Sequence, residues 1–396
     1  MMSTSTRCVV LGAGRIGAAI ALDLAADDLF EVAVVDREAH RAASVADDSR
    51  IRFRQSDLAI PGRVRELVSD CDLVIGAVPG WMGFEALQAA IEAGKNVVDI
   101  SFFEQDPFAL DGLARARGVT AVVDCGLAPG LSNLVLGMLA RKLDRVDSFR
   151  CLVGGLPQHP TPPWNYKAPY SPSDVIEIYT RPARLVRGGA IVTMPALTES
   201  ERIEIPGVGW LDAFNTDGLR TLLRTTTVPE LTEKTLRYPG HRERVAELAS
   251  CGFFDEGRKE ITVGLLAEQW LQTDDDHDVT AMRLEAVGLR GGNPIRVTYD
   301  LLDKFDRERG ISSMARTTGY TCTAVARLIA RKDFVRPGII PPEMIGADAH
   351  CYASILRDLD QRGIVFRVVE EQLPGTPRGL PGEAHGEGVQ NGKAIE

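Results

Sequence analysis

The sequence predicts an α/β protein: a doubly wound parallel sheet, followed by a second domain of α+β type. Two observations predict this class. Apolar strands alternate with helices from residue 8 to residue 123, at a spacing typical of parallel strands joined by crossover helices. From residue 126 onward, several segments instead carry apolar residues at every second position, which is typical of antiparallel strands with one buried face.

The first strand, residues 8–11, runs into a glycine-rich turn and then a helix at 18–26. Gly12 permits the tight turn, Gly14 lets the backbone approach a pyrophosphate, and Gly17 lets the helix pack closely on the strand. Phosphates would bind the free N–H groups at the helix N-terminus. This arrangement predicts a Rossmann domain that binds a dinucleotide. The residues expected to contact the coenzyme lie at the ends of the strands: Gly12, Gly14, Arg15, Ile16, Gly17, Asp36, Arg37, Asp57, Ala77, Val78, Pro79 and Phe102.

The second strand, residues 30–35, is followed by Asp36, at the spacing expected of the acidic residue that binds the adenosine ribose. A carboxylate accepts hydrogen bonds from a ribose 2′-hydroxyl and repels a 2′-phosphate. The sequence therefore predicts NAD in preference to NADP. Arg37 could turn toward a 2′-phosphate and weaken that preference.

The remaining elements follow in order. In the nucleotide domain, residues 1–125, we expect strands at 51–53, 73–78, 96–100 and 119–123 and helices at 63–69, 84–93 and 110–117. In the second domain, residues 126–311, we expect a helix at 131–142 and strands at 148–153, 190–194, 201–205, 262–266 and 282–288. Two long helices follow at 314–331 and 347–362, and the tail at 373–396 is expected to be disordered because it is poor in large apolar residues.

Composition excludes some functions. The formal charge of −10 argues against a nucleic-acid partner and against an anionic membrane surface. No stretch offers the roughly 20 apolar residues needed to span a bilayer, and the first residues do not resemble a signal peptide. The seven cysteines form no C-x-x-C pair and are expected to be reduced thiols. We therefore expect a cytoplasmic protein.

Several polar residues could carry chemistry. Asp124 follows the sixth strand, where its carboxylate could hold a substrate ammonium group or accept a proton; alternatively, it caps the next helix. A proline-rich, aromatic segment at 157–172 carries Asn165, Tyr166 and Lys167. Tyr166 and Lys167 could move a proton at a reacting amine, or Tyr166 could simply help Trp164 to anchor the segment on the sheet.

Arg237 stands before a Tyr-Pro-Gly turn and could bind a substrate carboxylate, although a surface salt bridge is the alternative. His241 could act as an acid or base in a pocket, or could be structural. The acidic run at 274–278 includes His277 but reads as a solvated turn, because no second cluster of ligands is spaced to complete a metal site. We predict no metal.

Longer motifs show a resemblance to a known family. They read Asp-Cys-Gly-Leu-Ala-Pro-Gly at 124–130, Val-Gly-Gly-Leu-Pro at 153–157, Thr-Leu-Arg-Tyr-Pro-Gly-His at 235–241 and Met-Ala-Arg-Thr-Thr at 314–318. With these motifs the chain resembles the saccharopine reductase-like dehydrogenases, and among them the lysine 6-dehydrogenases most closely. Two features depart from the latter: Ser101-Phe102-Phe103 replaces a glycine-rich segment, and Tyr166-Lys167 is more similar to saccharopine reductases.

The resemblance implies a Rossmann domain joined to an α+β domain that binds substrate and carries the contacts of a homo-oligomer. It also implies that the C-terminal helices, about 312–365, fold back on the nucleotide domain, and that Ser101, Asp124, Tyr166 and Arg237 lie around a small amino-acid substrate.

Three hypotheses follow. The first is NAD-dependent oxidative deamination of the terminal amine of a basic amino acid, L-lysine foremost, to a 6-semialdehyde that cyclises. Arg237 would hold the α-carboxylate, Asp124 would orient the amine, and Tyr166 or Lys167 would manage the proton, with Ser101, Asn165 and His241 also lining the substrate site.

The second hypothesis is the reverse chemistry, a reductive condensation of an amine with a carbonyl acid as in saccharopine reductases. Saccharopine carries three carboxylates, so this pocket should gather several cations, for which five arginines are available: Arg181, Arg184, Arg187, Arg220 and Arg224. The third hypothesis is a non-catalytic NAD-binding sensor, which would lack convergent polar residues beside the nicotinamide.

Overall fold

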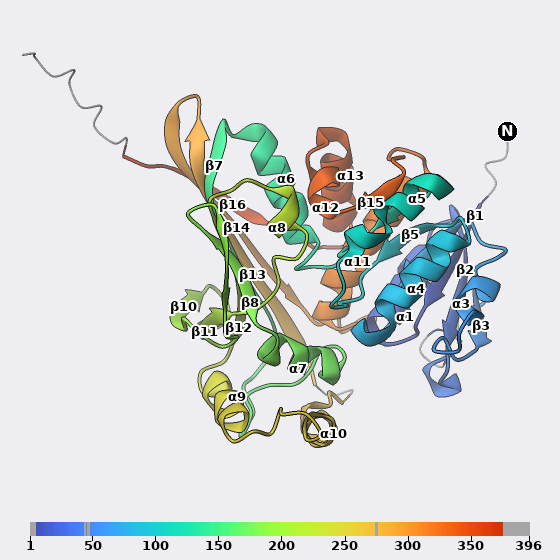
Figure 1. The fold of residues 1–396 in the computed structure, drawn as a ribbon, viewed down its shortest axis with the longest axis horizontal. Coiled ribbons are helices and arrows are strands. Elements are labelled where there is room, and N and C mark those ends of the chain that lie inside the picture. Colours follow the sequence, from blue (N-terminus) through green and yellow to red (C-terminus); the bar gives the residue numbers. More distant parts are fainter. Residues whose placement is uncertain (1–4, 43–44, 46–47, 274–275, 375–396) are drawn as a thin grey trace, which may run out of the picture.

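The computed structural model describes residues 5–42, 45, 48–273 and 276–374. Its first sheet is wholly parallel, with seven strands in the order β15-β6-β5-β4-β1-β2-β3 (Figure 1). This confirms the predicted doubly wound sheet. The strands are β1 (Thr6–Leu11), β2 (Phe30–Asp36), β3 (Ile51–Gln55), β4 (Leu73–Gly76), β5 (Asn96–Asp99), β6 (Thr120–Val122) and β15 (Gly338–Ile340).

Helices cover both faces of this sheet because successive side chains of each buried strand point to opposite sides. Val10 of β1 belongs to the core on the face covered by α1, whereas Val9 and Leu11 pack in a separate core with Leu87 and Ile91 of α4. The helices and 3-10 segments of this part are α1 (Arg15–Ala25), η1 (Ala39–Ala42), α3 (Arg63–Leu67), α4 (Gly80–Glu92), η2 (Pro107–Leu110) and α5 (Asp111–Arg117).

The second sheet has nine strands, in the order β10-β11-β12-β7-β13-β14-β16, with β8 pairing with β12 and β9. Its pairs are antiparallel except β12 with β7, so the predicted mostly antiparallel sheet is confirmed. The strands are β7 (Arg145–Pro157), β8 (Ala183–Arg187), β9 (Ala190–Met194), β10 (Glu201–Ile205), β11 (Gly209–Asn215), β12 (Glu230–Arg237), β13 (Asp278–Arg290), β14 (Asn293–Lys304) and β16 (Arg367–Gln372).

The helices of the second domain are α6 (Leu131–Lys142), α7 (Pro172–Thr180), α8 (Leu222–Thr225), α9 (His241–Ser250) and α10 (Lys259–Trp270). The strand predicted at 262–266 is wrong, since these residues lie inside α10. Ile261 and Leu265 belong to the apparent alternation, but both are exposed. The buried residues are Thr262, Leu266 and Trp270, which are spaced by four and share one helical face.

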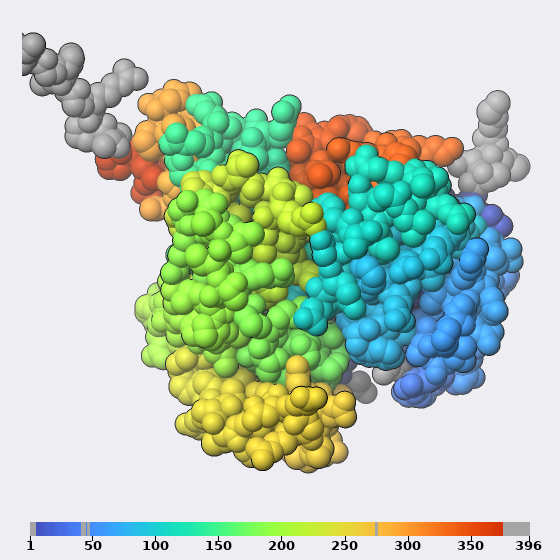
Figure 2. Space-filling view, viewed as in Figure 1, coloured from blue at the N-terminus to red at the C-terminus, as the bar shows by residue number. Residues whose placement is uncertain are grey.

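The chain then returns to the nucleotide domain through α11 (Ser313–Ala330), followed by β15, α12 (Pro342–Gly346) and α13 (Ala349–Asp360). Helix α11 packs along α1, and Arg327 of α11 forms an ion pair with Asp23 of α1 at 3.0 Å. Strand β15 pairs with β6 and completes the parallel sheet. The segment from α11 to α13 therefore belongs spatially to the nucleotide domain, whereas β16 returns to the second sheet. Figure 2 shows the two domains touching along an extended seam.

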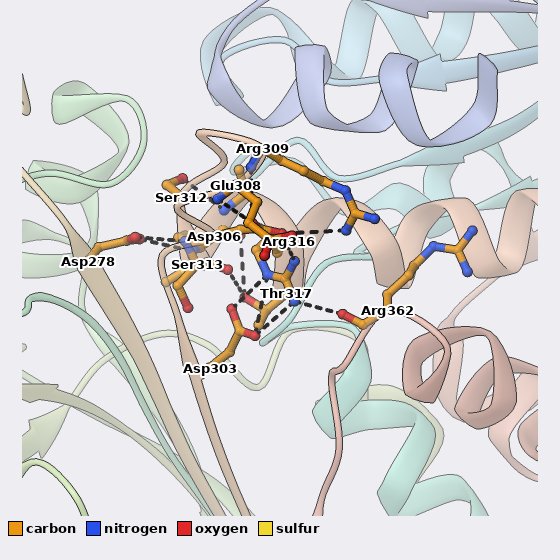
Figure 3. Close-up of polar contacts among 12 residues, drawn as sticks. Asp278, Asp303, Asp306, Glu308, Arg309, Ser312, Ser313, Arg316, Thr317 and Arg362 are labelled. Atoms are coloured by element: carbon orange, nitrogen blue, oxygen red, sulfur yellow. Dashed lines mark hydrogen bonds and ion pairs between the residues drawn. The ribbon is translucent and has the colours of Figure 1, made fainter. Parts of the chain in front are cut away.

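A polar cluster anchors the start of α11 to the second sheet (Figure 3). The carboxylate of Asp278 accepts hydrogen bonds from the backbone N–H groups of Ser313 and Met314, at 2.7 and 3.0 Å. One turn later, Arg316 pairs with Asp303 and Asp306 at 3.2 and 2.9 Å. These contacts fix α11 between the two sheets.

In the part of the chain that the structure describes, no helix is long and apolar enough to cross a membrane. The tail that was predicted to be disordered, 373–396, lies outside the described residues except for its first two.

Candidate active site

The predicted coenzyme turn connects β1 to α1. Gly12 has φ of +104°, and its N–H donates to the carbonyl of Val35 at 2.8 Å. A methyl group at Gly12 would overlap the carbonyl oxygen of Ala77, and one at Gly17 would overlap that of Gly12. Gly14 is the N-cap of α1, and within the described residues no side chain caps this helix. Because the turn is tightly folded and the first N–H groups of α1 are uncapped by side chains, it fits a pyrophosphate.

Asp36 braces this turn. Its carboxylate accepts hydrogen bonds from the N–H groups of Ala13 and Glu38, at 2.7 and 2.9 Å, and the residue is only 8% exposed. Arg37, by contrast, is exposed, and its Nε donates to Glu38 at 3.1 Å. Asp57 lies just beyond β3, where its carboxylate accepts from the N–H of Ala59.

Ala77, Val78 and Pro79 lead from β4 into α4, which approaches the 101–103 segment very closely. A methyl group at Gly80 would overlap the carbonyl oxygen of Phe102, and one at Gly83 would overlap the Ser101 side chain. Ser101 itself is buried, and its N–H and hydroxyl both donate to Asp99, at 2.8 and 3.3 Å. Burial raises the pKa of Asp99 well above its ordinary value, and the nearby charge of Asp124 adds to this effect.

The second domain reaches this edge through α7. Asp174 accepts from the N–H of Gly80 at 3.3 Å, and burial raises the pKa of Asp174 to about 6. Directly after α7, the guanidinium of Arg181 lies 5.0 Å from the centre of the Phe102 ring. Helix α7 therefore closes the carboxyl edge of the parallel sheet against the second domain (Figure 1).

Asp124 forms a buried ion pair with Arg220, with Arg220 Nη2 and Asp124 Oδ1 separated by 3.2 Å. Both side chains are almost wholly buried, and both residues have positive φ, +53° and +49°. Arg220 also donates to the carbonyl of Phe103 and lies over the Phe102 ring at 5.0 Å. The carboxylate that was expected to orient an amine is thus already paired with a cation.

Arg181 and Arg220 consequently lie over one aromatic ring at equal distances. Nη1 of Arg181 is buried and makes no hydrogen bond within the described residues, whereas Nη2 of Arg220 lies 3.2 Å from Asp124 Oδ1 in their ion pair. Unpaired buried donors are costly and are usually satisfied by a partner. The pair is therefore suited to binding an anion beside Phe102.

Arg237 lies in an aromatic cluster built by β12, the 158–171 segment and α10. Its Nε donates to the hydroxyl of Tyr179 at 2.7 Å, and its guanidinium lies 4.5 Å from the centre of the Tyr166 ring. The ring of Tyr166 also stacks edge-on against Trp270. Burial raises the pKa of Tyr166 well above its ordinary value, so this phenol is neutral near pH 7.

His241 belongs to the same cluster. Its Nδ1 lies 2.9 Å from the carbonyl of Trp164 and its Nε2 lies 3.0 Å from the hydroxyl of Tyr179. A carbonyl only accepts, so Nδ1 carries the proton and Nε2 accepts from Tyr179. Burial and the charge of Arg237 lower the pKa of His241 to about 3, which keeps the ring neutral. His241 therefore orients Tyr179, which in turn orients Arg237.

The other predicted residues of the 158–171 segment make backbone contacts. The amide of Asn165 donates to the carbonyl of Pro239 at 3.2 Å. Lys167 Nζ donates to the carbonyl of Leu271 at 3.0 Å, and next to it Arg15 of the glycine turn donates to Gln272. The structure thus places Lys167 with Arg15 at Leu271 and Gln272, apart from the aromatic cluster that contains Tyr166.

In the sequence Arg181 and Arg220 are only two of five available cations, and no pattern marks Tyr179 or Glu233 as functional. Glu233 lies on β12, two residues from Thr235 and four from Arg237, and accepts from Thr216 Oγ1 and the N–H of Gly218, at 2.6 and 3.1 Å. Burial raises its pKa to about 7. A single Arg or Glu in a loop or strand gives no local signal of this convergence; only a β12 face of alternating polar residues could have suggested it.

Comparison with known proteins identifies the family. A model of the saccharopine dehydrogenase NADP binding domain matches residues 8–122, and a model of the saccharopine dehydrogenase C-terminal domain matches residues 126–364. The chain belongs to the saccharopine dehydrogenase family. The saccharopine dehydrogenases are oxidoreductases acting on CH–NH groups, which supports the predicted enzyme class.

Individual members of the saccharopine dehydrogenase family are distant. The yeast saccharopine dehydrogenase [NADP(+), L-glutamate-forming] of Saccharomyces cerevisiae is 24% identical over 64% of this chain and 59% of its own length. An alpha-aminoadipic semialdehyde synthase of Arabidopsis thaliana is 26% identical over 59% of this chain, but only 24% of its own length is matched. A solved structure of apo saccharopine dehydrogenase (L-Glu forming) from yeast covers 93% of this chain and all of its own, with a TM-score of 0.76 at 19% identity.

The prediction of NAD as coenzyme is wrong. The matched amino-terminal model is an NADP binding domain, and the yeast relative is named for NADP(+). The structure supplies a physical reason, because the Asp36 carboxylate is turned into the glycine turn and accepts two backbone N–H groups. These two N–H groups offset part of the carboxylate charge, and the exposed Arg37 beside it carries the charge complementary to a 2′-phosphate.

Among the described residues, no group of three or more His, Cys, Asp or Glu side chains could hold a metal ion. The absence of a metal stays a prediction, and so does the homo-oligomer.

Proposed function

We propose that this protein is an NADP-dependent saccharopine dehydrogenase-like enzyme that joins an amine to a carbonyl acid by reduction, or cleaves the product in the reverse direction. The observation that carries the proposal is the pair of guanidinium groups over Phe102, of which Arg181 has a buried N–H donor that lacks a hydrogen-bond partner in the described residues. Arg237 is a further buried arginine of the second domain. We propose that it shares one substrate crevice with Arg181 and Arg220, which would then offer the several cations that a substrate with several carboxylates requires.

The residues present fit the coenzyme. The turn from Gly12 to Gly17 and the N-terminus of α1 would hold its pyrophosphate, and Arg37 would approach its 2′-phosphate. When bound, the coenzyme supplies or accepts the hydride in the reduction or oxidation of a carbon–nitrogen bond.

The chain's own residues would bind and orient the substrate. Arg181 and Arg220 would hold a carboxylate over Phe102, and Asp124 would keep Arg220 in place through the buried ion pair. Arg237 would hold a second carboxylate, oriented by Tyr179 and His241. The neutral hydroxyl of Tyr166 would be a hydrogen-bond donor beside that group, and α7 would exclude water from the crevice.

The test is a substrate panel with purified enzyme, followed by the absorbance of NADPH. We expect turnover of saccharopine with NADP⁺ in preference to NAD⁺. In the reverse direction we expect L-glutamate and alpha-aminoadipic semialdehyde to be joined at the expense of NADPH. Replacing Arg181 by Gln should raise the KM for saccharopine by about 10- to 100-fold, because a charge-assisted hydrogen bond contributes roughly 1.5 to 3 kcal/mol.

Arg187→Gln is the matched control, since Arg187 lies on β8 at the surface, paired with Glu199. Its KM should equal that of the wild type. An Arg181→Gln enzyme with unchanged KM would contradict the carboxylate site.

The narrower hypothesis, oxidative deamination of L-lysine as in lysine 6-dehydrogenases, belongs to the same panel. L-Lysine has one carboxylate, for which Arg237 alone would suffice, and its amine would need a free carboxylate. Asp124 is engaged by Arg220, which favours the condensation. Robust NADPH formation from L-lysine, with none from saccharopine, would reverse this order.

A further inference from the structure

A polar cavity of about 370 Å³ lies on the nucleotide domain, at the ends of α1, α11 and α13. Its lining includes Ala26, Arg331 and Gln361, which are the C-cap residues of these three helices. The C-terminus of a helix carries a partial negative charge of about half a unit. Three such ends facing one cavity produce a negative potential, before any side chain is considered.

Part of the side-chain charge is neutralised within the wall. Asp23 pairs with Arg327 and Arg362 at 3.0 and 2.6 Å, and Asp27 pairs with Arg327 at 3.1 Å. Two carboxylates thus face two guanidinium groups. The carbonyl of Arg362 accepts from Arg316 at 2.7 Å, while its guanidinium points away from the Arg316 cluster (Figure 3). These ion pairs and this hydrogen bond hold the charged side chains of the cavity wall in place.

Asp358 of α13 is different. It lines the cavity and is 9% exposed, yet its carboxylate has no hydrogen bond or ion pair with any described residue. Its carboxylate oxygens are therefore available to accept hydrogen bonds from a ligand in the cavity. Two further charges line the cavity and are exposed, Asp28 and Arg331. Three charged groups of the lining are thus not used in these ion pairs: the carboxylates of Asp358 and Asp28 and the guanidinium of Arg331.

We propose that this cavity is a binding site for a small organic cation with primary ammonium groups, of the class of a diamine or a basic amino acid. One ammonium group would bind Asp358 and a second would bind Asp28, and the carboxylate of an amino acid would bind Arg331. A compact metal ion fits less well, because three arginines line the cavity and, among the described residues, no cluster of metal-ligating side chains is found. The site is separate from the crevice of the proposed reaction and does not depend on it.

The test is titration calorimetry of the full-length protein with two probes, 1,4-diaminobutane and L-ornithine. We expect the wild type to bind the diamine, and Asp358→Asn to bind it at least about tenfold more weakly, since a charge-assisted contact is lost. Asp360→Asn is the matched control, because Asp360 is exposed at the end of the same helix and does not line the cavity. Its affinity should equal that of the wild type.

L-Ornithine distinguishes the two members of the ligand class. If L-ornithine binds more tightly than the diamine, and Arg331→Gln lowers the affinity for L-ornithine to that for the diamine, the ligand is a basic amino acid. If the diamine binds more tightly and Arg331→Gln has no effect, it is a diamine. The absence of heat with both probes, or equal affinity in Asp358→Asn and the wild type, would overturn the proposal. Because Asp358 has no partner to lose, the variant should fold, which thermal unfolding of the same samples verifies.

Discussion

The coenzyme turn and the charged crevice are built by different means. The turn is made of backbone, and its glycines lie close together in the sequence. Gly12 has no side chain to meet the carbonyl of Ala77, and Gly17 has none to meet the carbonyl of Gly12. The crevice is made of side chains that come from separate elements, with Asp124 after β6, Arg181 after α7 and Arg220 before α8. A backbone site depends on local sequence, whereas a side-chain site depends on the completed tertiary structure.

Breaking the crevice should have the largest effect. We expect Arg220→Gln to lower the free energy of unfolding by about 3 to 5 kcal/mol, because it leaves the buried carboxylate of Asp124 unpaired. Asp124→Asn should lower the free energy of unfolding by a similar amount, because it leaves the buried guanidinium of Arg220 unpaired. Asparagine tolerates the positive φ of this position, so backbone strain would not be the cause. Urea unfolding measures both.

The double variant Asp124→Asn/Arg220→Gln should recover part of that loss, since neither charge is then left alone. Glu370→Gln serves as the surface control, because Glu370 on β16 pairs with Arg290 at an exposed site and such pairs contribute about 0 to 1 kcal/mol. Losses that add without recovery would show that the two residues do not act as a pair.

The second prediction concerns pH and Glu233. Its pKa is raised from 4.5 to about 7 by burial, so the folded protein holds this proton over a range in which the unfolded chain has lost it. The associated stability is complete below pH 4.5 and is lost as pH rises through 7. We expect this group to lower the free energy of unfolding by up to about 3 kcal/mol between pH 4.5 and pH 8.

Glu233→Gln should remove this part of the pH dependence. The free energy of unfolding of the variant should therefore rise relative to that of the wild type as pH rises. Asp174, with a pKa of about 6, contributes a slope of the same sign in both proteins and cancels in the comparison. Glu247→Gln, at an exposed position of α9, should keep the wild-type profile. Parallel profiles for Glu233→Gln and the wild type would disprove the assignment.

The smallest stability effect is expected in the coenzyme turn. Gly17→Ala would force its methyl group against the carbonyl of Gly12, and such overpacking costs about 1 to 3 kcal/mol. Because the displaced atoms form the phosphate turn, NADP⁺ affinity should fall as well, as titration calorimetry would measure. Gly112→Ala in α5 is the control, since its methyl group meets no atom within 4 Å. Equal NADP⁺ affinity in Gly17→Ala and the wild type would exclude this turn from the coenzyme site.

The same contrast explains what the sequence could predict. The turn from β1 to α1, helix α6 and strands β9 and β10 lie at the expected residues, because apolar periodicity and glycines act locally. The aromatic segment was expected either to serve catalysis or to anchor on the sheet. In the structure Tyr166 and Trp164 both contact Trp270 of α10, an element that the sequence reading had taken for a strand.

The coenzyme preference failed for a related reason. The carboxylate of Asp36 stands at the expected position, but its direction depends on the N–H groups of Ala13 and Glu38, which the pattern does not show. Likewise, nothing near Arg181 or Arg220 in the sequence indicates that both approach Phe102, which lies at least 79 residues away in the chain.

Strand β15 has a consequence for how this protein is made. It adds the outermost strand beside β6, yet it is separated from β6 in the chain by all of the second sheet except β16. The ribosome must therefore synthesise most of the second domain before the last strand can join the nucleotide sheet. A fragment that stops near residue 125 would present the unpaired N–H and C=O groups of β6 to other chains. The interleaved chain thus favours cooperative folding of the two domains, and dissecting them at the junction should yield an aggregating fragment rather than a portable coenzyme-binding module.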